Sequence, residues 1–180
     1  MNLFLNELFN LENKVVLLTG SGGHLVSEMA RSCGMAGMKV VCTDFKLETA
    51  QKTMNQILDN GGDAIAIEVD VTKKVDHENA LSITIDSYGK LDYLLNGAGS
   101  NAPTPFFDIS VDEWNNILAV QLTGTMLSCQ VFGKYMIEQK YGSIINISSA
   151  SSGPPLSKAF TYSVAKSGVK NLTQNLAREW

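Results

Sequence analysis

Short apolar runs alternate with segments of helical periodicity along the 180 residues of this chain. The run at 14–19 is too rich in valine and leucine to alternate, as expected for a strand buried on both faces, and the other runs are also typical of strands. They predict five strands, over 14–19, 39–43, 64–69, 91–95 and 143–147. Helical patterns lie over about 25–34, 47–58, 74–88, 111–139 and 160–180. This alternation requires right-handed crossovers and a parallel sheet, so the fold class is α/β and doubly wound.

Glycines and polar residues directly follow the predicted strands. They are Gly20–Gly23, Asp44, Asp70, Asn96–Gly99 and Ser149. The carboxyl ends of parallel strands lie at one edge of an open sheet, and ligands bind there at the point where the strand order reverses. We therefore predict that these residues meet in one site.

The composition predicts a single soluble domain over residues 1–180, because 44% of the residues are hydrophobic and 18% are charged. A net charge of -4 and a pI near 5.1 argue against a nucleic-acid partner. No stretch approaches the roughly 20 apolar residues of a membrane helix, so we expect no membrane association. In the first ten residues Glu7 interrupts the apolar positions and no basic residue precedes them, which argues against a signal peptide.

The three cysteines, Cys33, Cys42 and Cys129, are odd in number and widely spaced. This pattern favours buried thiols in a reducing compartment over disulfides or a zinc site. With no signal peptide and no membrane segment expected, the sequence predicts a cytoplasmic protein that binds no metal.

The turn Gly20-Ser21-Gly22-Gly23 lies where the first strand gives way to a helix. Glycines at this point let backbone amides approach a pyrophosphate, and the helix N-terminus adds a partial positive charge. A tight structural turn is the competing interpretation, since the spacing does not complete the pattern G-x-G-x-x-G.

Asp44 favours the dinucleotide interpretation, because it lies 24 residues beyond Gly20 at the end of the second strand. Its carboxylate can accept hydrogen bonds from an adenosine ribose and repels a 2′-phosphate, which favours NAD over NADP. Nearby Lys46 weakens that preference. The alternative is that Asp44 caps the helix that follows it.

Tyr162 and Lys166 are four residues apart and therefore share one face of the last predicted helix. An ammonium beside a phenol stabilises the phenolate, which suits a tyrosine that acts as a general acid or base near neutral pH. Ser149 can supply a further hydrogen bond, or it is only a loop hydroxyl. The pair by itself is weak support for catalysis, since such spacing also arises by chance.

Taken in order, these residues resemble the short-chain dehydrogenase/reductase family over essentially the whole chain. Thr19-Gly20 opens a turn like the family's T-G-x-x-x-G-x-G, and Asp70-Val71 is similar to the pair that borders the adenine. Asn96-Gly97-Ala98-Gly99 resembles the family's N-N-A-G stretch. Ser149 precedes Tyr162 by 13 residues, close to the family's interval between serine and tyrosine, which favours Ser149 over Ser148.

The resemblance implies a Rossmann-type sheet with strand order 3-2-1-4-5 and hydride transfer between a nicotinamide and a secondary alcohol or ketone. Tyr162 would exchange a proton with the substrate oxygen, Lys166 would favour the phenolate and bind the nicotinamide ribose, and Ser149 would hold the substrate oxygen. The implied cofactor-binding residues are Gly20, Ser21, Gly22, Gly23, His24, Leu25, Asp44, Asp70, Val71, Asn96, Gly97, Ala98, Gly99, Tyr162 and Lys166.

The chain departs from the family pattern at three positions that bear on the site. His24 and Val26 stand where the second and third glycines of the turn are usual, so helix-strand packing must differ there. His24 either donates to a phosphate or faces solvent. Gln121 replaces the usual asparagine that supports the catalytic lysine through water. Its longer amide either keeps that support or displaces the water.

The family normally continues through two more strands beyond the helix in which this sequence ends. The resemblance therefore implies a truncated sheet with apolar surface exposed beside the fifth strand. The leading hypothesis is an NAD-dependent oxidoreductase, similar to members that act on sugar acids such as mannonate or fructuronate. The alternative is a dinucleotide-binding protein or inactive fragment without catalysis. Family members associate through the long helix and the Tyr162 helix, so a homo-dimer or homo-tetramer is expected.

Overall fold

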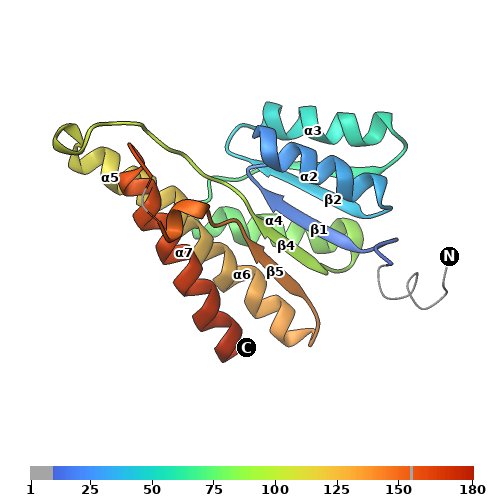
Figure 1. Cartoon of the computed structure of the whole chain (residues 1–180). Helices are drawn as coiled ribbons and strands as arrows, with labels where there is room; N and C mark the ends of the chain where they lie inside the picture. Colours follow the sequence, from blue (N-terminus) through green and yellow to red (C-terminus); the bar gives the residue numbers. More distant parts are fainter. Residues whose placement is uncertain (1–9, 155) are drawn as a thin grey trace.

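The computed structural model describes residues 10–154 and 156–180. Its core is a five-stranded parallel sheet in the order β3-β2-β1-β4-β5, which confirms the predicted fold class (Figure 1). The strands are β1 (Val15–Thr19), β2 (Lys39–Asp44), β3 (Asp63–Glu68), β4 (Tyr93–Asn96) and β5 (Ser143–Asn146). Residues 1–9, which include most of the segment weighed as a signal peptide, lie outside the described residues.

Each strand is followed by helical structure, as the periodicity predicted. The α-helices are α2 (His24–Met35), α3 (Leu47–Asp59), α4 (Lys74–Tyr88), α5 (Val111–Leu118), α6 (Gly124–Glu138) and α7 (Phe160–Glu179). The short elements are the 3-10 helices η1 (Phe106–Asp108) and η3 (Ala150–Ser152) and the π-helical turn η2 (Ala119–Thr123).

The long helix predicted over 111–139 is interrupted by η2, which separates α5 from α6. Thr123-Gly124, where the glycine makes a kink in the predicted helix plausible from the sequence, lies at the end of this π turn. A π turn widens the helix by one residue and breaks the regular hydrogen-bond ladder, and such turns are frequent at functional sites. Gln121 lies at its centre.

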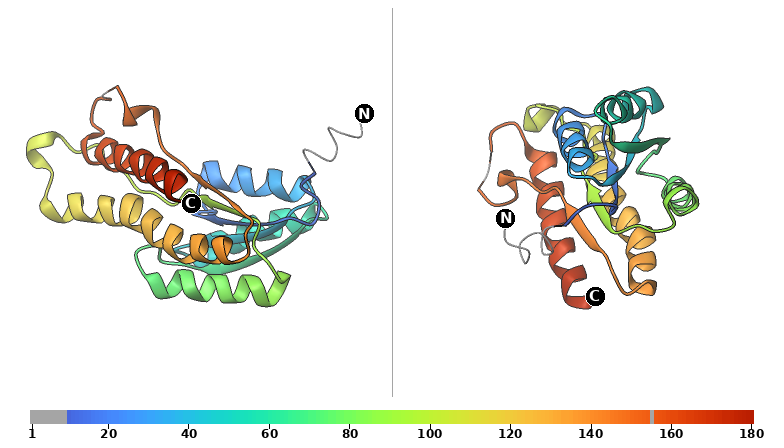
Figure 2. Two further views of the ribbon diagram at one scale, coloured as in Figure 1. Left: turned by 90° about the horizontal axis from the view of Figure 1, so that it is seen from below. Right: turned by 90° about the vertical axis from the view of Figure 1, so that its right-hand side faces the viewer.

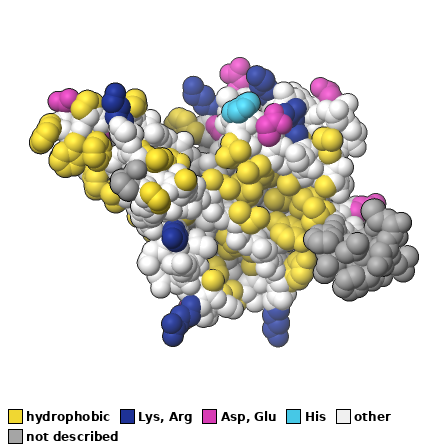
Figure 3. Space-filling model, in the orientation of Figure 1, with side chains coloured by type: hydrophobic (Ala, Val, Ile, Leu, Met, Phe, Trp, Pro, Cys, Tyr) yellow, Lys and Arg dark blue, Asp and Glu magenta, His cyan; other side chains and the backbone are white. Residues whose placement is uncertain are grey.

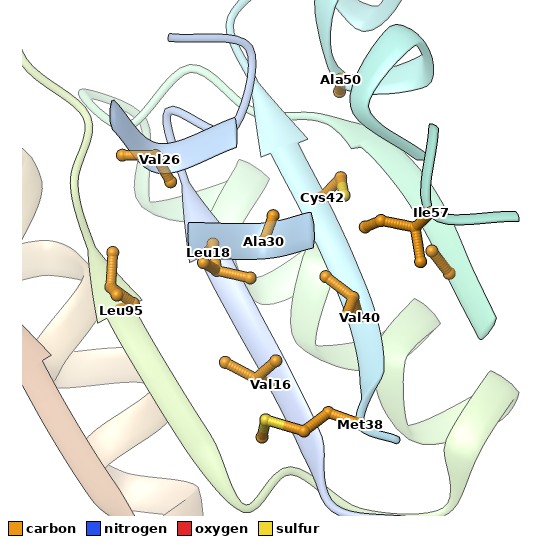
Figure 4. Packing of buried hydrophobic residues seen from close by; sticks show 11 residues of the cluster. Val16, Leu18, Val26, Ala30, Met38, Val40, Cys42, Ala50, Ile57 and Leu95 are labelled. Atoms are coloured by element: carbon orange, nitrogen blue, oxygen red, sulfur yellow. The ribbon is translucent and has the colours of Figure 1, made fainter. Parts of the chain in front are cut away.

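Two hydrophobic layers cover the sheet because successive side chains of β1 point to opposite faces. Val16 and Leu18 pack on one face against α2 and α3, as Figure 4 shows. Val15 and Leu17 pack on the other face against α4 and α6. Figure 2 shows α2 and α4 on opposite sides of the sheet. Burying each such valine or leucine stabilises the fold by about 1.5–3 kcal/mol, so β1 anchors both layers.

The fourth strand begins two residues later than predicted, since Leu91 and Asp92 lie in the connection between α4 and β4. The buried carboxylate of Asp92 accepts the backbone N–H of Val15 at 2.8 Å and pairs with Lys90 at 2.9 Å. An apolar run cannot reveal this bond, because its partner is 77 positions away.

β5 is the edge strand of the sheet and pairs with β4. Its side chains alternate between exposed and half-buried, and Ile145 is 51% exposed. The exposed apolar surface expected beside this strand is therefore present at Ile145. Among the described residues, no helix combines the length and the apolar character needed to cross a membrane.

Candidate active site

A cavity of about 620 Å³ lies at the carboxyl ends of β1, β2 and β4. Most of the predicted cofactor residues contribute to its wall. The lining includes Gly20, Gly23, His24, Leu25, Asp44, Asp70, Val71, Gly97, Ala98 and Gly99. Residues far apart in the sequence thus meet where the strand order reverses, which is where doubly wound folds bind ligands.

The glycine turn after β1 is fixed by close backbone contacts. Gly20 has a φ of +77°, and a Cβ there would lie 2.7 Å from Cα of Ala98. Only glycine fits this conformation and this approach. A Cβ on Gly22 would lie 2.4 Å from Cβ of Thr49, so Gly22 is also restricted. Gly22 and the buried Ser21 belong to this turn but do not line the cavity.

The carboxylate of Asp44 joins the glycine turn to α3. Its Oδ2 accepts the backbone N–H of Gly22 at 2.9 Å, and its Oδ1 accepts the hydroxyl of Thr49 at 2.9 Å. Asp44 lines the cavity and is not the cap of α3, because the N-cap of that helix is Lys46 and no side chain caps it.

Val26 stands at the position of the third glycine of the turn, and Gly97 makes room for it. It is buried in the layer between α2 and the sheet. A Cβ on Gly97 would lie 2.5 Å from Cγ2 of Val26, so the glycine on β4's loop makes room for the valine on α2. A side chain at position 26 thus fits against the sheet because position 97 has none. His24 is exposed at the first position of α2.

The loop after β3 is tightly hydrogen-bonded. Asp70 Oδ1 accepts the backbone N–H of Thr72 at 3.0 Å and its hydroxyl at 2.7 Å, while Oδ2 lies 3.3 Å from Lys73 Nζ. Burial raises the pKa of Asp70, but the bonds from Thr72 and Lys73 outweigh it and leave the pKa below its usual value. The carbonyl of Val71 lies 2.9 Å from Nε2 of the buried His77.

Asn96 lies behind the cavity and is not part of its lining. Its Nδ2 donates to Oδ1 of Asn146 at 2.8 Å, and its Oδ1 accepts the hydroxyl of Ser128 at 2.6 Å. Asn146 in turn donates to Thr173 at 2.9 Å. This network ties the ends of β4 and β5 to α6 and α7, because its four members come from these four elements.

Tyr162 and Lys166 share a face of α7, as predicted. Lys166 Nζ lies 5.6 Å from the centroid of the Tyr162 ring and donates to the carbonyl of Ile147 at 2.6 Å. The lysine is 5% exposed, and burial lowers its pKa to about 8. Ser148 donates to the carbonyl of Lys166 at 3.0 Å, so the segment after β5 is held against α7.

Ser149 precedes η3, and its side chain is held by Ser151. Ser149 Oγ accepts the backbone N–H of Ser151 at 3.2 Å and the hydroxyl of Ser151 at 3.1 Å. The loop-hydroxyl interpretation is therefore partly correct, because Ser149 caps this short helix. No sequence pattern distinguishes Ser151, since a serine in a serine-rich loop carries no periodic signal.

Gln121 is 1% exposed and bonds to the loop after β4. Its Nε2 donates to the carbonyl of Ser100 at 2.7 Å. Oε1 has no hydrogen-bond partner within the described part of the chain. A Cβ on Gly99 would lie 2.8 Å from this oxygen, so Gly99 leaves the space that the longer amide occupies.

Comparison with known proteins places this arrangement among oxidoreductases. The family model described as short chain dehydrogenase matches residues 14–180. An uncharacterized oxidoreductase, UxuB of Bacillus subtilis, is 33% identical over an alignment of 183 positions, which covers 93% of this chain and 66% of that protein. The 5-keto-D-gluconate 5-reductase of Escherichia coli K12 is 31% identical over 175 residues, covering 97% of this chain and 69% of the reductase.

A solved structure of a short-chain oxidoreductase also has this fold. A metagenomic short-chain oxidoreductase in complex with NADP superposes with a TM-score of 0.88 at 28% identity, over 94% of this chain and 77% of that one. The present chain spans about two thirds of the length of the two curated relatives. The family match over residues 14–180 and these relatives show that the chain belongs to the short-chain dehydrogenase family.

Proposed function

We propose that the chain carries the cofactor site and the proton-transfer residues of an oxidoreductase that interconverts a secondary alcohol and a ketone. The observation that carries this proposal is the buried lysine beside the phenol: Lys166 Nζ lies 5.6 Å from the Tyr162 ring on the same helix. Structural lysines are rarely buried without a carboxylate partner. In a dehydrogenase fold, a role in proton transfer accounts for this placement.

The cavity has the features that a dinucleotide needs. The glycine turn brings backbone amides and the N-terminus of α2 to the cavity wall, where they favour a pyrophosphate. Val71 and Gly97–Gly99 also line the cavity. When bound, the nicotinamide cofactor supplies or accepts the hydride.

We further propose that NAD is preferred over NADP. The proposal rests on the charge of Asp44 at the cavity wall, since a carboxylate repels a 2′-phosphate. The related metagenomic oxidoreductase was solved with NADP, so the family by itself does not decide between the two cofactors. Comparison of the two cofactors with this chain tests the preference directly.

In the proposed reaction Tyr162 gives its hydroxyl proton to the ketone oxygen during reduction and takes it from the alcohol during oxidation. The Lys166 ammonium stabilises the phenolate left behind, because opposite charges attract strongly at a buried site. Ser149 holds the same substrate oxygen by a hydrogen bond.

A keto sugar acid or a polyol is the proposed substrate class. The Escherichia coli relative, named as a 5-keto-D-gluconate 5-reductase, supports this choice at 31% identity. The resemblance of Asn96–Asn101 to sugar-acid oxidoreductases points the same way. A panel of keto sugar acids and polyols, assayed with NADH or NAD, identifies the substrate.

The decisive experiment compares the full-length wild-type protein with Tyr162→Phe. We expect the variant to bind NADH normally and to lose about 10²–10⁴ in kcat, the usual contribution of a general acid or base. Tyr135→Phe, on α6, is the matched control and should retain activity. Normal turnover by Tyr162→Phe contradicts the proposal. Calorimetric binding of NADH without conversion of any substrate favours a dinucleotide-binding protein without catalysis.

We also propose a homo-dimer or homo-tetramer. The supporting feature is an aromatic patch of Phe106, Phe107 and Phe160, whose neighbouring ring centroids lie 5.2–5.7 Å apart. Phe107 is 97% exposed. Figure 3 shows hydrophobic side chains gathered at the end of the molecule where α5 lies. A single monomeric species in sedimentation at micromolar concentration argues against assembly.

A cytoplasmic location is proposed from the cysteines. Cys33, Cys42 and Cys129 are all free thiols. Burial raises the pKa of Cys42 to about 12 and that of Cys129 to about 11, so these thiols are protonated and unreactive. Fractionation of cells that produce the tagged protein tests the location.

A further inference from the structure

We propose that Ser151 is a positioning residue that fixes the Ser149 hydroxyl as a hydrogen-bond donor toward the substrate oxygen. This inference deepens the proposed function and rests on it, since Ser149 holds the substrate oxygen there. It assigns a role to a buried serine that matches no motif in the sequence.

The two acceptor sites of the Ser149 hydroxyl are both occupied by Ser151. The backbone N–H of Ser151 lies 3.2 Å from Ser149 Oγ, and the hydroxyl of Ser151 lies 3.1 Å from it. A hydroxyl group has two lone pairs and a single proton. With both lone pairs engaged, Ser149 can contribute only its proton to an incoming ligand.

The direction of the bond between the two hydroxyls follows from burial. Ser151 is 2% exposed, and within residues 10–154 and 156–180 its hydroxyl bonds to Ser149 Oγ and to no other atom. If Ser149 donated to Ser151 instead, the Ser151 proton would be left buried without an acceptor. Leaving a buried donor unpaired is unfavourable.

The substrate oxygen requires the same direction. A ketone oxygen accepts hydrogen bonds and donates none. The order Ser151 to Ser149 to ketone therefore satisfies every group, whereas the reverse order leaves the Ser151 proton without an acceptor and the ketone oxygen without a bond from Ser149. The alkoxide that develops when Tyr162 deprotonates an alcohol is also an acceptor, so one orientation serves both reaction directions.

The chain of two hydroxyls also strengthens the hydrogen bond from Ser149 to the substrate oxygen. Hydrogen bonds in a chain polarise one another, and the effect is larger away from water. The Ser151 hydroxyl makes the Ser149 proton a better donor at the moment when negative charge develops on the substrate oxygen. Ser151 thus acts through Ser149 and does not touch the substrate.

The test removes only the hydroxyl of Ser151. Ser151→Ala retains the backbone N–H bond to Ser149, so the turn itself is preserved. We expect kcat to fall about three- to tenfold, the worth of one hydrogen bond, with the dissociation constant of NADH and the thermal midpoint unchanged. The assay uses the full-length protein and the ketone with the fastest turnover in the substrate panel.

Ser152→Ala is the matched control within the same turn. The Ser152 hydroxyl donates to the backbone carbonyl of Ser149 at 2.7 Å, so this variant removes a bond to Ser149 without affecting the Ser149 side chain. We expect it to keep wild-type kcat. An equal loss in both variants would assign the effect to the stability of the turn and overturn the proposal.

A double-mutant cycle isolates the chain of two hydroxyls from other effects. In a Ser149→Ala background, Ser151→Ala should cause no further loss, because no hydroxyl remains to be oriented. The isosteric pair Ser151→Thr and Ser151→Val covers the case in which alanine disturbs folding. Thr should keep most of the wild-type kcat, and Val should show the loss seen with Ala.

The outcomes separate this inference from the proposed function. Turnover that Tyr162→Phe abolishes but that Ser151→Ala leaves unchanged overturns the inference alone. An equal loss of kcat from Ser151→Ala in the wild-type and Ser149→Ala backgrounds also overturns it. Absence of turnover by the wild-type protein with every substrate overturns the proposed function and this inference together.

Discussion

The carboxylate of Asp44 accepts the backbone N–H of Gly22 at 2.9 Å, so the end of β2 is bonded directly to the glycine turn after β1. One acidic side chain therefore shapes the turn and places a negative charge at the cavity wall. These two roles can be separated by a substitution that keeps the acceptor and removes the charge.

Asp44→Asn should shift cofactor preference toward NADP. The amide oxygen can still accept from Gly22, whereas the repulsion of a 2′-phosphate is lost. We expect the ratio of kcat/KM for NADH to that for NADPH to fall by about tenfold or more, measured by steady-state kinetics. Asp59→Asn, at the exposed end of α3, is the control and should leave the ratio unchanged. A wild-type protein that already prefers NADPH would refute the assignment.

Lys166→Met should change how stability depends on pH. Burial lowers the pKa of Lys166 from 10.5 to about 8, so the folded protein binds fewer protons than the unfolded chain between these values. The cost of the buried ammonium is fully present below pH 8 and is relieved as pH rises. Between pH 8 and pH 10 the free energy of unfolding of the wild type should therefore rise by about 2 kcal/mol relative to that of the variant.

Denaturant unfolding of both proteins across this range measures the difference. Lys170→Met removes an exposed lysine from the same helix, and its curve should run parallel to that of the wild type. Parallel curves for Lys166→Met as well would mean that the lysine is not desolvated in the folded protein.

His77→Gln should make the protein less sensitive to acid. Burial lowers the pKa of His77 below 6.5, although the bond to Val71 and the charges of Asp76 and Asp70 oppose this. The unfolded chain binds a proton there at a higher pH than the folded protein does, so stability is lost as pH falls through 6.5. We expect the wild type to lose more stability than the variant between pH 7 and pH 5.

Thermal unfolding at pH 7 and pH 5 measures this change in stability. The change between the two pH values is compared, because glutamine also removes the ring packing against Phe132 at either pH. His24→Gln changes the other histidine, which is exposed, and should keep the wild-type pH response. Equal acid sensitivity in His77→Gln would show that His77 does not govern it.

Gly99→Ala should be destabilising through its contact with Gln121. The new Cβ would lie 2.8–3.0 Å from the amide atoms of Gln121, which must move and give up the bond to Ser100. We expect a loss of about 1–3 kcal/mol in the free energy of unfolding. Gln121→Asn shortens the amide and loses the same bond, so the double variant should lose less than the sum of the two single variants. Strict additivity would argue against the contact.

Several parts of the site could be predicted from the sequence because they depend on local periodicity. Apolar runs and helical spacing predicted the five parallel strands, and the residues after β1 to β4 predicted most of the lining of one cavity. The spacing of Tyr162 and Lys166 determined that they share a helix face. Each of these inferences uses neighbours within one element, for which the geometry is fixed by the backbone.

Other features depend on partners that only the tertiary structure brings together. Asn96 was expected in the cavity, yet it bonds to Asn146, which is 50 positions away. Val26 fits because Gly97 lacks a side chain, and the Gln121 amide donates to the carbonyl of Ser100, which is 21 positions away. A hydrogen bond or a close contact depends on positions to within tenths of an ångström. Sequence periodicity determines which elements form and which way they face, whereas their final packing decides which atoms meet.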